Sequence, residues 1–144
     1  MQVQSISNSQ NFNGRFMFYS PSKAGAIISE DILTYIPHLR GKDLACVQKK
    51  ISSCPFDLYI SKSQDLDGFW ELNASAKLEN LLKRKEQGIV RPALVREDKV
   101  DRVPAMADEA IYKYEKSPEY YEDIKSENLL KLLFKKIFKK GINE

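Results

Sequence analysis

Two alternating segments near the middle of the chain constrain the fold more than any other feature. Apolar residues take every second position in residues 56–61, and the same period returns in residues 69–74. A period of two places the apolar side chains on one face of a β-strand. The connection between the segments contains Asp67-Gly68, a dipeptide typical of turns. The pattern therefore predicts an antiparallel hairpin in which 56–61 pairs with 69–74.

Helical patterns lie on both sides of this hairpin. Each has apolar residues at steps of three and four, behind a Ser, Asp or Pro that can begin a helix. Ser117-Pro118 is a further start signal of the same kind. Gly88 is placed to close the expected helix that ends at about residue 87. The expected helices cover residues 29–36, 43–54, 75–87, with Ser75 as cap, and 104–114.

Further strands are expected near both ends of this region. Residues 15–19 are rich in aromatic side chains, and residues 89–96 favour a strand that Pro92 either splits or places at a sheet edge. Residues 22–28 are ambiguous. Together the segments predict an α+β fold: a small antiparallel sheet of three to four strands, with helices packed on one face and a helical C-terminal third.

The same patterns divide the chain into three parts. We expect residues 1–13 to form a flexible polar leader and residues 14–103 to form the α+β core. Residues 104–144 are expected to be a C-terminal helical segment of the same domain.

Length and composition favour one small soluble domain. The chain has 144 residues, of which 42% are hydrophobic and 30% charged, which suffices for a hydrophobic core. No apolar run approaches the roughly 20 residues that span a bilayer, and the first ten residues lack the basic and apolar regions of a signal peptide. We therefore expect a cytoplasmic protein. Cys46 and Cys54 would lie too far apart on one helix for a disulfide, which predicts two free thiols.

The motifs favour a protein with no enzymatic activity, cofactor or small-molecule ligand. Neither glycine-rich phosphate motif occurs, and the Gly-x-Ser-x-Gly elbow of hydrolases is missing too. His38 is the only histidine, so metal sites that need two are excluded, and a surface or helix-end role is simpler than catalysis. An enzyme based on paired carboxylates is the third interpretation, because such pairs meet only in the fold.

Two other motifs have ordinary structural interpretations. Residues 63–68 resemble the start of a calcium-binding EF-hand loop, but the twelfth position, which needs a bidentate acid, is Ala74. We interpret these residues as a hairpin turn and expect no metal. The triplet Asn73-Ala74-Ser75 matches the glycosylation sequon, yet it also fits a strand end followed by a helix cap.

The strongest local pattern lies in residues 126–141. Apolar residues recur there at the spacing of one helix face, and lysines occupy the remaining arc. Ser126 fits as the N-cap and Gly141 as the closing residue, so we expect a helix from about 127 to about 140. The candidate contact residues are Leu130, Lys131, Phe134, Lys135, Lys136, Ile137, Phe138, Lys139 and Lys140.

The positive charge of the chain is concentrated in the same region. Residues 125–144 contain six of the 23 basic residues and two of the 20 acidic ones, so the other 124 residues have a net charge of −1. This balance argues against a broad nucleic-acid-binding surface on the body of the chain. Tyrosines and lysines interleave in residues 112–125, as they do in proteins that bind single-stranded nucleic acid. The acidic residues among them favour a packed helix face instead.

Three interpretations of residues 126–140 follow. The helix can pack its apolar face on the sheet, bind an anionic membrane or a partner's groove, or contact nucleic acid through its lysines. We expect a small non-enzymatic binding or adaptor protein that uses this basic amphipathic helix to contact a partner protein or an anionic membrane surface. The alternative is a nucleic-acid-associated protein that uses the same lysine cluster.

Overall fold

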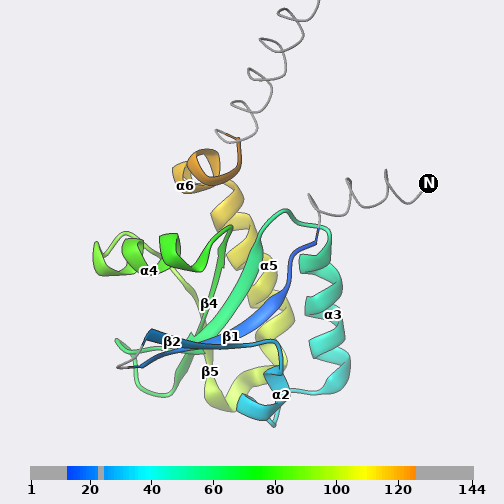
Figure 1. The fold of residues 1–144 in the computed structure, drawn as a ribbon. Coiled ribbons are helices and arrows are strands. Elements are labelled where there is room, and N and C mark those ends of the chain that lie inside the picture. The colour runs from blue at the N-terminus through cyan, green and yellow to red at the C-terminus, as the bar shows by residue number, and fades with distance from the viewer. Residues whose placement is uncertain (1–12, 23–24, 126–144) are drawn as a thin grey trace, which may run out of the picture.

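A five-stranded sheet forms the centre of the structure (Figure 1). The computed structural model describes residues 13–22 and 25–125. The strand order is β2-β1-β3-β4-β5, in which β1 and β3 are parallel and all other neighbours are antiparallel. The strands are β1 (Phe16–Ser22), β2 (Gly25–Ser29), β3 (Asp57–Lys62), β4 (Phe69–Ser75) and β5 (Ala93–Arg96).

The central hairpin confirms the prediction from alternation. β3 and β4 pair antiparallel from Asp57↔Ser75 to Lys62↔Trp70. Gly68 closes the turn with a φ of 83°, a conformation that glycine adopts without steric cost. β5 begins directly after Pro92 and forms one edge of the sheet, as the proline predicted.

The sheet is larger than predicted, and it is mixed rather than antiparallel. The additional strand, β2, comes from the segment that the sequence left ambiguous. Ile27 and Ile28 point to opposite faces of this edge strand and are both 50% exposed, so no alternation between buried and exposed residues marks it. The parallel pairing of β1 with β3 depends on the crossover through the helices between them, which periodicity does not encode.

Helices cover both faces of the sheet, whereas the sequence led us to expect them on one. α3 and α5 lie on one face and α4 lies on the other (Figure 1). Ser75 is the last residue of β4 and not the cap of α4, although Gly88 follows that helix with the expected positive φ of 71°. The helical elements are α2 (Ile32–Tyr35), α3 (Gly41–Ser52), α4 (Leu78–Glu86), the 3-10 segment η1 (Glu97–Arg102), α5 (Val103–Glu115), α6 (Pro118–Tyr120) and the π-helical turn η2 (Tyr121–Lys125).

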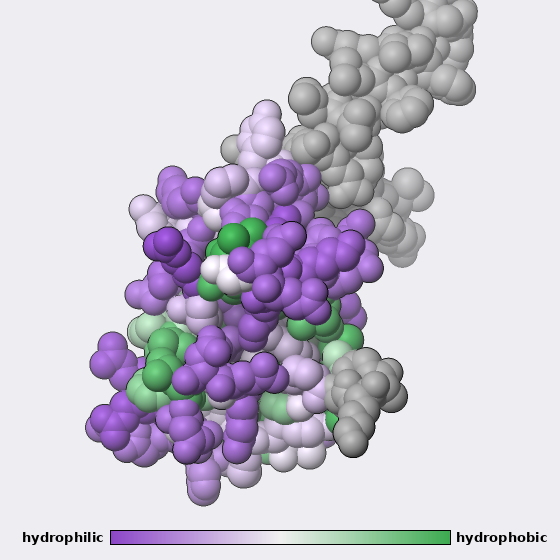
Figure 2. Space-filling model, turned by 90° about the vertical axis from the view of Figure 1, so that its left-hand side faces the viewer, coloured by the Kyte–Doolittle hydropathy of each residue, from purple (hydrophilic) through white to green (hydrophobic). Residues whose placement is uncertain are grey.

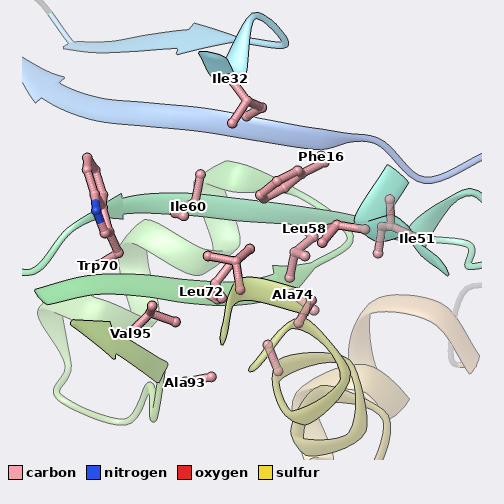
Figure 3. Close-up of a cluster of buried hydrophobic side chains, with 14 of the residues drawn as sticks. Phe16, Ile32, Ile51, Leu58, Ile60, Trp70, Leu72, Ala74, Ala93 and Val95 are labelled. Carbon is pink, nitrogen blue, oxygen red and sulfur yellow. The ribbon is translucent and has the colours of Figure 1, made fainter. Parts of the chain in front are cut away.

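The main hydrophobic core fills the space between the sheet and the helices α3 and α5 (Figure 3). Alternate residues of the three central strands point into it, and α3 and α5 contribute their apolar faces. Its fully buried members include Ile51, Leu58, Ile60, Leu72 and Val103.

A smaller cluster lies on the opposite face, beneath α4. It consists of Met17, Tyr19, Tyr59 and Leu81, with partly buried neighbours from α4 and from the segment before β5. This face is mixed in character, because the buried polar residues Glu71 and Asn73 come from it as well. Both faces of β4 are therefore buried, one against an apolar layer and the other against a partly polar one.

The described residues also bear on two simpler expectations. Cys46 is exposed and Cys54 is buried, and both thiols are free, as predicted. Within residues 13–22 and 25–125, no helix has the length and apolar character needed to cross a membrane.

Candidate functional site

The predicted contact residues lie outside the described part of the chain. All nine of them, from Leu130 to Lys140, fall in residues 126–144, for which the structure gives no description. The described chain ends at Lys125, directly before the predicted helix. The features that bear on function are therefore those that surround this end of the domain.

A buried ion pair holds the last described turn, η2, against α4. Arg84 donates from Nη1 to Oδ2 of Asp123 at 2.7 Å, and from Nη2 to Oδ1 at 2.8 Å. The two side chains are only 13% and 5% exposed. Asn80 also donates to Asp123 Oδ1, at 3.2 Å. Two-point pairing of this kind fixes orientation as well as distance, so the position of η2 relative to α4 is well defined.

Tyr114 connects the same carboxylate to α5. Its hydroxyl donates to Asp123 Oδ2 at 2.7 Å and accepts from the backbone N–H of Ala76 at 3.1 Å. Its ring packs edge-to-face against Phe56 and Tyr120. One carboxylate therefore joins α4, α5 and η2, with the hydroxyl serving as both donor and acceptor.

The protonation states of this network suit a structural role. Burial raises the pKa of the Tyr114 hydroxyl, and its hydrogen bond to Asp123 raises it further. Burial alone would raise the pKa of Asp123, but hydrogen bonds from Arg84, Tyr114 and Asn80 bring it below its ordinary value. Both shifts move titration away from neutral pH. A general acid or base works best with a pKa near the working pH, so these groups are poorly suited to proton transfer.

A second charged cluster lies under α4. Lys85 Nζ lies 2.8 Å from Oε1 of the buried Glu71 and donates to the Tyr19 hydroxyl at 3.0 Å. Burial lowers the pKa of Lys85, but the hydrogen bonds to Glu71 and Tyr19 outweigh it and the net shift is upward. A second cavity, of about 380 Å³, adjoins this cluster. The buried hydroxyl of Ser61 lines it and has no hydrogen-bond partner among the described residues. A lysine that stays protonated does not activate a serine as a nucleophile.

A cavity of about 420 Å³ opens beside the end of β4 that does not pair with β5, between α4, α5 and α6. We call it the β4-edge cavity. Its volume lies in the range of small-ligand sites. The Asn73 amide nitrogen and Oε2 of Glu119 are buried and have no hydrogen-bond partner among the described residues. Polar lining is contributed by Asn73, Arg84, Arg91, Lys113, Tyr114 and Glu119.

The structure places two motifs that the sequence singled out. His38 is exposed in the turn between α2 and α3. Residues 63–68 form the connection between β3 and β4. Among residues 13–22 and 25–125, no cluster of three or more His, Cys, Asp or Glu side chains is arranged to hold a metal ion.

No pattern in the sequence identifies the residues of the ion-pair network or of the cavity. Arg84 and Asp123 are 39 positions apart, and no periodicity connects them. Tyr114 is the last residue of the predicted helix 104–114, and the helical pattern indicates no partner for its hydroxyl. Comparison with protein families, curated proteins and solved structures finds no match to this chain.

Proposed function

We propose that this chain is a non-enzymatic binding or adaptor protein of the cytoplasm that uses residues 126–140 to contact a partner protein or an anionic membrane surface. The observation that carries this view is the buried Arg84–Asp123 pair, which fixes η2 on the domain immediately before the basic segment. The domain therefore provides a defined attachment point for that segment.

The distribution of charge supports a contact with an anionic surface. Residues 125–144 have a net charge of +4 within a chain whose total is +3. An anionic surface would attract this segment and leave the domain largely unaffected. Each lysine close to an anionic lipid surface contributes about 1 kcal/mol, and apolar residues on the other face of a helix add to binding by insertion.

On the side seen in Figure 2, the surface of the described residues offers little apolar area for a contact. That side is mainly hydrophilic, with small hydrophobic patches separated by hydrophilic surface. Residues 126–140, by contrast, place five apolar residues at the spacing of one helix face. Residues 126–140 are thus the better candidate for apolar docking.

A salt titration of full-length protein tests the mode of binding, with mixed phosphatidylserine–phosphatidylcholine vesicles as one probe and a mixed-sequence RNA as the other. Apolar docking on vesicles should largely survive raised salt and should be lost in the double variant Phe134→Ala, Phe138→Ala. Tyr112→Ala is the matched control, because Tyr112 is an aromatic residue that is 62% exposed on α5. Tighter binding to RNA, falling linearly in log salt, would instead support the nucleic-acid alternative.

A further inference from the structure

We propose that the β4-edge cavity binds an extended peptide segment of a partner protein, ending in or containing a carboxylate, which adds as a short strand to the end of β4 that β5 leaves unpaired. This site lies on the domain itself and is independent of residues 126–140. The inference combines the hydrogen-bonding pattern of the sheet, two unpaired side chains and the charge at the mouth of the cavity.

On the β5 side, the sheet leaves one end of β4 without a paired strand. β5 pairs with β4 only as far as Leu72↔Ala93, whereas β4 continues to Ser75. In an antiparallel strand, successive residues direct their N–H and C=O groups to opposite neighbours. The Phe69 carbonyl accepts from Ser63 on the β3 side, and the Gly68 carbonyl accepts from Glu97 on the β5 side.

Ala74 therefore directs its N–H and C=O toward the side on which β5 has already ended. Continuation of the β4–β5 register would place Arg91 opposite Ala74, but that pairing stops at Ala93, directly after Pro92. The cavity lies at this position and is lined by β4, by residues 89–91 and by helices from both faces of the sheet. An added peptide strand offers the N–H and C=O that complete such an edge.

Two buried polar atoms at the cavity, one a donor and one an acceptor, have no hydrogen-bond partner among the described residues. Asn73 is 5% exposed, and its amide nitrogen lacks an acceptor among the described residues. Oε2 of Glu119 likewise lacks a hydrogen-bond donor among the described residues. A peptide group supplies both partners, because its C=O accepts and its N–H donates. Buried polar groups are normally paired, so a ligand with this double character fits the cavity better than a purely apolar one.

The charges at the cavity select the kind of peptide. Three cationic side chains line it against the single carboxylate of Glu119, and one of the cations, Arg84, is already neutralised by Asp123. Arg91 is exposed, and Lys113 has only an exposed partner in Glu109, at 3.4 Å. These two groups would receive a carboxylate. Apolar side chains of the peptide would meet Leu81, Ile89, Val90 and Ala110.

The terminal segments of this chain are poor matches for the cavity. Residues 1–12 contain no acidic residue, and residues 125–144 have a net charge of +4. Charge complementarity therefore favours a peptide from another protein.

The test uses the full-length protein and amide chemical shifts. The probe is a pool of acetylated, C-terminally amidated pentapeptides with β-branched residues at the second and fourth positions and Glu at the last. A matched pool, also amidated, has Lys in place of that Glu and therefore carries no carboxylate at its end. The acidic pool should shift the amides of residues 73–75 and of Arg91, and the Lys pool should bind about tenfold more weakly or worse, as expected when one charge-assisted contact is lost. Arg91→Glu should weaken the binding of the acidic pool by a similar factor. Arg102→Glu should not, because Arg102 is an exposed arginine away from the cavity.

Two results would overturn the assignment. One is equal binding of the acidic and Lys pools, or shifts from the acidic pool that avoid residues 73–75. The other is a shift of those amides, without any peptide, when the chain is ended after Lys125, because that would assign the cavity to the chain's own C-terminal segment. A failure of vesicle binding by residues 126–140 would leave this site unaffected, so the two proposals fail separately.

Discussion

Arg84 and Asp123 meet through two hydrogen bonds of 2.7 and 2.8 Å, although they lie 39 positions apart and belong to different helical elements. This pair holds η2 against α4, and residues 126–140 follow η2 directly in the chain. Arg84 also lines the β4-edge cavity. The ion pair therefore lies next to both proposed contacts of the protein.

Replacing one partner of this pair should destabilise the domain. Asp123→Asn leaves the largely buried Arg84 guanidinium with only the exposed Glu122, 3.4 Å away, as a counter-charge. We therefore expect the free energy of unfolding to fall by about 3 kcal/mol in urea denaturation. The matched control is Asp98→Asn, which breaks the Arg96–Asp98 pair at a similar distance, 2.8 Å, but with side chains 60% and 61% exposed. The control should change stability by less than about 1 kcal/mol. Equal effects of the two substitutions would contradict the structural role of the buried pair.

The same pair predicts a pH dependence. Because the folded-state pKa of Asp123 is lowered, its contribution to stability is complete above the ordinary carboxyl range, about pH 4, and is lost as the pH falls through the lowered value. The stability difference between the wild type and Asp123→Asn should therefore be largest near neutral pH and should shrink below about pH 4. Urea denaturation at a series of pH values measures it. A difference that stays constant into acid would show that Asp123 titrates normally.

Gly14 should tolerate no side chain. A Cβ atom there would lie 2.1 Å from the Phe56 carbonyl oxygen and 2.4 Å from that of Ile51, both of which are backbone atoms. Gly14→Ala should lower the free energy of unfolding by about 3 kcal/mol, because the strand and the helix end must move apart. Gly41→Ala is the control, since nothing lies within 4 Å of its added Cβ. A well-folded Gly14→Ala protein of wild-type stability would contradict the close approach at this position.

The two thiols should differ in reactivity. Cys46 is exposed, whereas burial raises the pKa of the Cys54 thiol and also shields it. In the native protein, a disulfide reagent such as dithionitrobenzoate should modify one thiol rapidly and the second only on unfolding. Cys46→Ser should abolish the rapid phase, and Cys54→Ser should preserve it. Rapid modification of both thiols in the native state would place Cys54 at the surface.

The sequence predicts this fold best where one face of an element is buried and the other is exposed. The amphipathic helices α3 and α5 have that character. The β3–β4 hairpin is buried on both faces, but one face is apolar and the other partly polar, so its alternation was informative as well. β2 is exposed at both Ile27 and Ile28, and it therefore left no periodic signal. The position of α4 on the second face could not be predicted, because β4 is buried on both sides and its alternation does not show which side receives which helix.

The candidate sites depend on contacts between distant residues, and these are not encoded locally. Arg84 belongs to a basic run of α4 that resembles a solvated helix end, and only the fold turns it toward Asp123. The β4-edge cavity exists because β5 is three residues shorter than β4. Pro92 marked the start of that strand, but a strand boundary does not reveal an open edge between two helices.

Co-sedimentation with vesicles tests the central claim most directly. Full-length protein and a chain ended after Lys125 are compared on vesicles that contain phosphatidylserine and on neutral phosphatidylcholine vesicles, with thermal unfolding to show that both chains fold. We predict that the full-length protein sediments with the anionic vesicles, that it sediments less with the neutral ones, and that the shortened chain stays in solution with both. Equal partitioning of the two chains on anionic vesicles would contradict a role for residues 126–140 in membrane contact.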